Sequence, residues 1–317
     1  MAAVAAQLRA TPNNAIAQLH RGAFGAVEFL RCDGANALPA RSEIAAYQHF
    51  SLPLSGSFVW HAENEAVFAD PTALLCTQKD EPYLITHPHG GDQTLVFFPR
   101  PHVLAEMSEQ AEKAGLGGRR RTFVASSRAQ LLAYTLCLNP LTARDSLAAD
   151  ECLLQFFESI ALSGKTVRTT RDDALVRRAL EYIHDTPELL LTLKGIATAL
   201  DVRSAYLTHA FAQRTGMPLY RYIMKLKLAR ALHKVALDAD DLTHIALDLG
   251  FSSHSHFSAA FKAHYGLTPS QLRDRVGRRR GRLRRQVPAR GEEGDARKIV
   301  WRPLCAARGG VQAQDQD

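Results

Sequence analysis

The sequence predicts an α+β protein with several domains: an N-terminal β-barrel with accessory helices, followed by an all-α domain built from a duplicated unit. Three observations lead to this prediction. Short apolar runs recur at close spacing over residues 20–100, and turn residues separate them. After Pro101 the apolar residues follow a helical period instead. Residues 191–269 then contain two related copies of one segment, 49 or 50 residues apart.

The β-region is predicted from short runs rich in Val, Phe, Tyr and Leu, separated by turn signals such as Gly90-Gly91-Asp92. Because alternate residues of a strand face opposite sides, we expect Phe50, Leu52 and Phe58 to line the interior of the barrel. The predicted strands are Phe24–Leu30, Gln48–Leu54, Ser57–His61, Ala66–Ala69, Ala73–Thr77, Tyr83–Thr86 and Thr94–Phe98.

Helical periodicity predicts three accessory helices: Val103–Lys113, Ser127–Leu138 and Ser146–Leu162. Order is expected to end near Val276. The predicted divisions are an N-terminal segment (1–19), the barrel (20–100), the accessory helices (101–164), a polar linker (165–171), the all-α domain (172–276) and a disordered basic tail (277–317).

Composition excludes several classes of protein. Apolar residues make up 46% of the chain and charged residues 22%, which is typical of a globular protein and not of a disordered or collagen-like one. No apolar run approaches the ~20 residues of a membrane span, and the first residues lack the pattern of a secretory signal. The five cysteines are scattered and never form a C-x-x-C pair, so we expect no disulfide framework, no thiolate metal site and a reducing cytoplasm.

The positive charge is concentrated at the C-terminus. The formal net charge is +7, but residues 277–317 alone carry 11 Lys and Arg against 5 Asp and Glu, largely because of the run Arg278–Arg285. A block of like charges is usually a solvated segment, so the overall basicity is weak evidence for a nucleic-acid partner.

The duplicated segment has the layout of a helix-turn-helix. The copies are Leu191–Pro218 and Leu242–Pro269, with motifs at about residues 192–213 and 241–263. In each copy an Ile-Ala pair is followed by a turn, a Ser that can cap the next helix (Ser204, Ser253), and two apolar residues at i and i+4. The other face of that second helix is polar, and such a helix fits the DNA major groove.

Between the copies, Leu219–Leu237 is predicted to be one long amphipathic helix that places the two second helices in successive major grooves. Any helical domain shows i/i+4 apolar pairs, so a single copy would leave a plain helical bundle as an equal alternative. Two copies with the same turn and the same Gly-x-x-Pro-like exit favour a helix-turn-helix pair.

Residues 172–276 resemble the DNA-binding domain of AraC/XylS-type bacterial transcription regulators. The second copy carries the family pattern I-A-x-x-x-G-F-x(5)-F-x(3)-F-K-x(3)-G-x-T-P, and Tyr222–Leu232 resembles the family's linker helix. The first copy departs from the pattern, with Asp201 where Gly is common and Arg203 where a capping Ser is common. Because Asp tolerates a left-handed backbone, we expect the turn to be kept.

The resemblance implies which side chains face DNA. They share an exposed position near the start of a second helix or on its polar face: Arg203, Ser204, Ala205, Thr208, His209 and Gln213 in the first copy, and Ser253, His254, Ser255, Ser258, Ala259 and Lys262 in the second.

The N-terminal region resembles the cupin-type sensor barrel found in many of these regulators, on strand rhythm alone. This resemblance implies that the helices from about 127 to 162 form a dimerisation or packing element. One cluster, His87-Pro88-His89 followed by Asp92, suggests a metal site. It lacks the spacing of a cupin metal motif and its proline interrupts a strand, so we expect solvated histidines in a turn, with no metal, cofactor or catalytic residue.

The leading hypothesis is a cytoplasmic, sequence-specific transcription regulator. Its implied partners are double-stranded promoter or operator DNA, RNA polymerase, a small-molecule effector and a second copy of the chain in a homodimer, with no membrane. Two alternatives stay open: a metal-dependent cupin enzyme fused to a DNA-binding module, and a non-specific architectural protein that binds DNA through its arginine tail.

Overall fold

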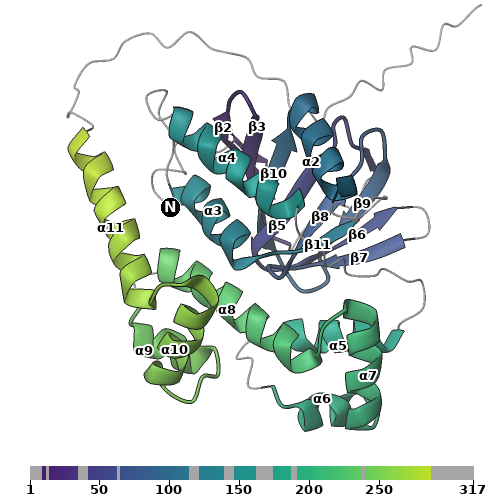
Figure 1. Ribbon diagram of the computed structural model, residues 1–317. Helices are drawn as coiled ribbons and strands as arrows, with labels where there is room; N and C mark the ends of the chain where they lie inside the picture. The colour runs from purple at the N-terminus through teal and green to yellow at the C-terminus, as the bar shows by residue number, and fades with distance from the viewer. Residues whose placement is uncertain are drawn as a thin grey trace, which may run out of the picture.

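The computed structural model places a sheet-rich N-terminal region beside a row of C-terminal helices (Figure 1). It describes residues 9–11, 14–34, 42–62, 65–113, 121–138, 146–161, 174–186, 191–237 and 240–286. The predicted linker at 165–171 lies outside these residues. None of the described helices is long and apolar enough to cross a membrane.

The larger sheet has seven strands in the order β1-β2-β3-β10-β5-β8-β11. Its central strand, β10, pairs antiparallel with β3 on one side and β5 on the other. Its strands are β1 (Arg9–Thr11), β2 (Asn14–Arg21), β3 (Gly25–Cys32), β5 (His49–Ser55), β8 (Ala73–Thr77), β10 (Asp92–Pro99) and β11 (Thr122–Val124).

The smaller sheet has four strands in the order β4-β9-β6-β7. They are β4 (Glu43–Ile44), β6 (Phe58–Ala62), β7 (Glu65–Ala69) and β9 (Pro82–Thr86). A core that includes Phe58, Trp60 and Val67 lies along this sheet and reaches Leu75 of β8 in the larger one. The strand-rich fold class is therefore confirmed, as two sheets that share a core.

The accessory helices α2 (Pro101–Lys113), α3 (Ser127–Leu138) and α4 (Ser146–Ala161) cover the larger sheet (Figure 1). The Phe97 ring of β10 stacks on Phe156 of α4 at a centroid distance of 3.8 Å. Phe50 contacts Phe157 of α4 in the same core. The expectation that Phe50 and Leu52 line a barrel interior is therefore wrong: both belong to the core under the helices, and β5 is buried on both faces.

Two separate cores run along α8, the helix between the two repeats. Leu219 and Leu226 belong to the core of the first repeat, whereas Leu228 and Leu232 belong to the core that includes the second repeat and the larger sheet. The C-terminal helices are α5 (Ala174–Asp185), α6 (Leu193–Ala199), α7 (Ser204–Thr215), α8 (Leu219–Leu237), α9 (Leu242–Asp248), α10 (His254–Tyr265) and α11 (Pro269–Gln286).

Two boundaries differ from those predicted. Strand β2 begins at Asn14, inside the segment set apart as 1–19, and pairs with β3. Helix α11 continues to Gln286, ten residues beyond the expected end of order at Val276, so the whole arginine run Arg278–Arg285 lies on a helix. Residues 287–317 lie outside the described part of the chain.

Candidate nucleic-acid interface

Both repeats form the predicted helix-turn-helix, and their turns have the same hydrogen bonds. In the first, the Val202 amide donates to the Ala197 carbonyl at 2.9 Å; in the second, the Phe251 amide donates to the Ala246 carbonyl at 2.9 Å. The turn residue is left-handed in both copies, with φ 55° at Asp201 and 69° at Gly250. The expectation that Asp preserves the turn is confirmed.

The starts of the two recognition helices, α7 and α10, differ in their caps. Ser253 caps α10, because its side chain accepts a hydrogen bond from the His256 amide at 3.1 Å. Helix α7 has Arg203 at the capping position, with no side-chain cap bond. The prediction that Ser204 caps α7 is wrong, since Ser204 is already the first residue of the helix.

Buried apolar residues anchor each recognition helix, and the opposite face of the helix is exposed to solvent. Leu207 and Phe211 of α7 and Phe257 and Phe261 of α10 are fully buried. Most of the side chains expected to face DNA are exposed: Arg203, Ala205, His209, Gln213, Ser253, His254, Ser255, Ala259 and Lys262. Three are half-buried: Ser204, Thr208 and Ser258.

Some of these side chains already have partners. The Thr208 hydroxyl donates to the Ser204 carbonyl at 2.9 Å, which ties it to its own helix. Ser258 Oγ lies 3.5 Å from Nε2 of His254, one turn earlier. His209 has neither restraint and projects from an exposed position, so it keeps its full hydrogen-bonding capacity for a ligand.

Sequence reasoning did not place Tyr206 among the DNA-facing residues. Tyr206 is 61% exposed on α7, an unusual position for an aromatic ring, and His256 occupies the corresponding position of α10. Tyr206 directly precedes the first apolar anchor, Leu207, as His256 precedes Phe257, and that spacing could have identified Tyr206. His256 Nδ1 lies 3.0 Å from Ser252 Oγ, so its ring is oriented by the turn.

Lys227 of α8 stabilises the second turn. Its Nζ donates to the Gly250 carbonyl at 3.0 Å and lies 5.7 Å from the centre of the Phe251 ring. Burial lowers the pKa of Lys227 below its ordinary value. The side chain thus connects the helix between the repeats to the turn that directs α10.

The second repeat is bound to the N-terminal region through α3. The Tyr265 hydroxyl of α10 donates to Gln130 Oε1 at 2.8 Å, and Gln130 Nε2 donates to the Pro71 carbonyl at 2.6 Å. Also on α3, the Tyr134 hydroxyl lies 3.0 Å from Nδ1 of His233 on α8 and donates to the Leu54 carbonyl of β5 at 3.2 Å.

The first repeat is bound through Asp70, in the turn between β7 and β8. This buried carboxylate accepts hydrogen bonds from Tyr222 of α8 and from the Thr72 amide, and its Oδ2 lies 3.2 Å from Nε2 of His184 on α5. Arg230 of α8 lies beside the same His184 ring, with Nη2 3.5 Å from Nδ1.

Opposing effects act on the pKa of Asp70. Burial alone raises it, but the hydrogen bond and charge of His184, with the hydrogen bonds from Thr72 and Tyr222, bring the pKa below its ordinary value. Burial and the nearby Asp70 charge raise the pKa of Tyr222 well above 10, so its hydroxyl remains a donor. The cluster therefore holds an ionised carboxylate between the N-terminal sheets and the first repeat.

Comparison with known proteins gives two family matches. The AraC-binding-like domain matches residues 2–163, half of the chain, and the helix-turn-helix domain matches residues 196–275. The chain belongs to the AraC-type transcription regulators.

Individual relatives match this AraC-type chain over part of its length. It is 29% identical over 101 residues to the transcriptional activator RhaS of Escherichia fergusonii, covering 32% of this chain and 36% of RhaS. It is 26% identical over 124 residues to the Msm operon regulatory protein of Streptococcus mutans, covering 39% of this chain and 45% of that protein. The matches thus span less than half the length of these relatives.

A solved structure of ToxT from Vibrio cholerae matches over 80% of this chain and 98% of its own, at 11% identity and a TM-score of 0.31.

In this AraC-type chain the histidines of the β9–β10 connection are not solvated, contrary to expectation. The side chains of His87 and His89 are 12% and 6% exposed. His89 Nδ1 lies 2.6 Å from Oδ1 of Asp185 on α5, which gives the N-terminal region a second polar contact with the helices of the first repeat. His87 faces Asp92 and Cys32 instead.

Proposed function

We propose that the protein is a sequence-specific DNA-binding transcription regulator whose N-terminal domain senses a small molecule or a protein partner. The observation that carries this proposal is the pair of recognition helices. Helices α7 and α10 follow turns with the same backbone geometry, present exposed polar faces and are joined by the continuous helix α8. Two helices so presented fit two major-groove segments of one DNA molecule.

The chemistry of the two faces indicates how DNA is read. Ala205 and Ala259 offer only methyl groups, and the serines are short, so direct hydrogen-bond readout is modest and DNA shape carries part of the specificity. His209 is the side chain of α7 best placed to bond a base edge, while Arg203 and Lys262 suit phosphate contacts.

The contacts at Asp70 and Gln130 support a route for the sensed signal. An effector that binds the N-terminal domain better in one arrangement of these contacts would shift the position of the helix-turn-helix pair relative to that domain. We propose promoter DNA, RNA polymerase and a second copy of the chain as partners, with the accessory helices α3 and α4 at the dimer contact. The four described cysteines form no disulfide, which fits a reducing cytoplasm.

We propose a binding role for the N-terminal domain and no catalytic one. The support is its match to the AraC-binding-like domain and the relatives' names as regulatory proteins.

The experiment selects bound sequences from a random DNA pool with the full chain and with one Asp substitution on each recognition helix. Ala205→Asp on α7 and Ser255→Asp on α10 occupy corresponding, exposed positions, so each adds a carboxylate to the DNA-facing side without disturbing a core. We expect the wild type to select a motif with two parts, and each variant to lose a different part.

The matched control is Ala105→Asp, an exposed alanine on α2 of the N-terminal region, which should select the wild-type motif. Selection of no motif by the wild type, or loss of both parts in the control, contradicts the proposal. Loss of the same part in both variants contradicts the assignment of one helix to each part.

A further inference from the structure

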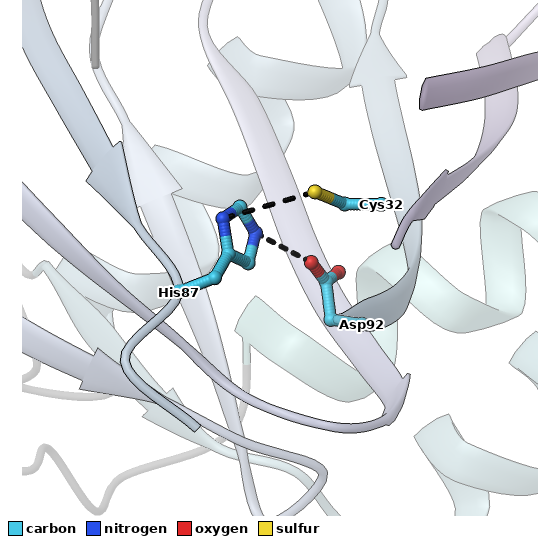
Figure 2. Close-up of side chains that lie close together, drawn as sticks. All are labelled: Cys32, His87 and Asp92. Carbon is cyan, nitrogen blue, oxygen red and sulfur yellow. Dashed lines mark hydrogen bonds and ion pairs between the residues drawn. The ribbon is translucent and has the colours of Figure 1, made fainter. Parts of the chain in front are cut away.

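Cys32, His87 and Asp92 come together at one end of the two sheets, from three separate stretches of chain (Figure 2). Cys32 ends β3 and Asp92 begins β10, and these two residues are direct cross-strand partners in the larger sheet. His87 follows β9 of the smaller sheet. The cluster therefore lies where the chain passes from one sheet to the other.

The spacing of the three side chains is close to that of ligands that share an ion. One potential ligand atom from each residue lies within 4.8 Å of the other two, and the described residues hold no other such group of three. Cys32 Sγ lies 3.8 Å from His87 Nδ1. Tetrahedral zinc, with bonds of about 2.0 Å to nitrogen and about 2.3 Å to sulfur, separates those two ligands by roughly 3.5 Å.

Hydrogen bonds around the cluster favour the ligating form of the imidazole. His87 Nε2 lies 2.7 Å from Asp92 Oδ1 (Figure 2), which orients the ring and leaves Nδ1 facing the sulfur. The other carboxylate oxygen of Asp92 accepts a hydrogen bond from the Thr94 hydroxyl. The donors therefore have the orienting contacts that are typical of built metal sites.

Close backbone contacts hold the cluster in place. A Cβ atom on Gly91 would lie 2.0 Å from the Cys32 carbonyl oxygen, and one on Gly56 would lie 2.2 Å from the Gly91 carbonyl oxygen. The chain around Cys32, the β5–β6 turn and the β9–β10 connection thus pack backbone against backbone beside the three side chains. Such packing restricts their movement before any ion binds.

We propose that Cys32 Sγ and His87 Nδ1 bind a divalent transition-metal ion of the zinc class, with Asp92 orienting the imidazole through Nε2. A thiolate and an imidazole are donors that zinc takes in proteins, and two protein ligands leave two positions for water or small-molecule donors. This site is independent of the proposed DNA interface, since it shares no residue with it.

The same three residues resemble a thiol activated by a His–Asp pair, which would make Cys32 a reactive nucleophile. The alkylation rate of Cys32 distinguishes such an activated thiol from a metal ligand.

The test is titration of the metal-free full chain with Co²⁺, a spectroscopic substitute for Zn²⁺, followed by competition with Zn²⁺. We expect a sulfur-to-cobalt charge-transfer band and the strong visible bands of a tetrahedral site, both abolished by Zn²⁺. Cys32→Ser should remove the charge-transfer band, and Asp92→Asn should weaken binding by about 10- to 100-fold. Cys152→Ser, at a buried cysteine of α4, is the matched control and should keep both bands.

The thermal unfolding of each variant is also measured without metal, so that a loss of metal binding can be distinguished from a loss of folding. Absence of the charge-transfer band in the folded wild type overturns the proposal, as does its persistence in Cys32→Ser. Alkylation of Cys32 faster than that of a free thiol at neutral pH, with no cobalt band, also overturns it and identifies an activated thiol.

Discussion

Asp70 and Tyr222 are 152 positions apart in the sequence, and the Tyr222 hydroxyl donates a hydrogen bond to the Asp70 carboxylate in the buried contact between the sheets and the first repeat. His184 and Arg230 complete the same cluster. A buried carboxylate among these groups means that the two regions are connected by charge as well as by apolar packing.

Asp70→Asn should therefore destabilise the protein. Removing one partner of a buried charged cluster costs about 3–5 kcal/mol, because Arg230 is left without its counter-charge. Tyr222→Phe removes one hydrogen bond to a charged group and should cost about 1.5–3 kcal/mol. Urea denaturation measures both, with Tyr182→Phe on the exposed side of α5 as the control. Equal stability of Asp70→Asn and the wild type would show that the Asp70 cluster does not stabilise the contact between the sheets and the first repeat.

The contribution of Asp70 should also depend on pH. Because its folded pKa is below the unfolded value of about 4, its ionised form stabilises the protein above that value, and the benefit is lost as the pH falls through the folded pKa. The stability difference between the wild type and Asp70→Asn should thus be full near neutral pH and shrink below about pH 4. Urea midpoints at a series of pH values measure it, and a difference that grows in acid would reverse the sign we assign.

Gly250→Ala should weaken the second helix-turn-helix. The backbone at Gly250 is left-handed, and a Cβ atom there costs about 1–2 kcal/mol. Gly277→Ala is the matched control with the opposite sign, because Gly277 lies in α11 and a Cβ there meets nothing within 4 Å. That change should stabilise the helix by about 0.5–1 kcal/mol. Thermal unfolding of both variants measures these changes in stability. Destabilisation by Gly277→Ala would show that backbone conformation does not distinguish Gly277 from Gly250.

His209→Ala and Phe261→Ala should separate base reading from folding. His209 is exposed on α7, so its loss should cost about 1–3 kcal/mol at one base position only. Phe261 is fully buried in α10, so its loss should cost about 3–5 kcal/mol of stability and weaken binding to every sequence alike. A panel of single-base operator variants distinguishes them, with His102→Ala as the exposed-histidine control on α2. A uniform loss across the panel for His209→Ala would exclude base reading by His209.

The arginines of α11 should set part of the salt dependence of DNA binding. Replacing the six arginines within Arg278–Arg285 by Gln should make the slope of log K against log salt shallower, by about 0.9 for each phosphate that the protein no longer neutralises, while the preferred site stays the same. Truncation after Gln286 is the control, since residues 287–317 carry five Lys and Arg and five Asp and Glu. A change in the preferred site would show that these arginines read bases.

Much of this architecture was predictable because its signals are local. The bounds of α3, α8 and β8 coincide with those predicted from apolar spacing. The duplicated turn was predictable because two copies repeat the same small set of residues. Strand β2 was not, because it exposes Ile16 and buries His20 against Asp150, the reverse of an amphipathic pattern.

The missed contacts depend on residues far apart in the chain. Nothing in the sequence near Asp70 indicates that α5 and α8 bring three polar side chains to it. The turn predicted around His87 and His89 is present, but their burial follows from Asp92 and from Asp185 of a distant helix. Phe50 was assigned to the wrong core because strand alternation cannot show which face the accessory helices cover.

Helix α8 contributes to both cores and runs without a break from Leu219 to Leu237, a length of roughly 28 Å at 1.5 Å per residue. A connection of this kind resists twisting, so the distance and rotation between α7 and α10 are nearly constant. Half-sites on DNA repeat every ~10 base pairs along one side of the duplex. Inserting about five or about ten base pairs between the two halves of the bound site should abolish tight binding and leave contact by one recognition helix alone, because α8 can neither twist nor lengthen to follow the new spacing. Tight binding should therefore require a fixed separation between the two half-sites as well as the correct bases within each of them.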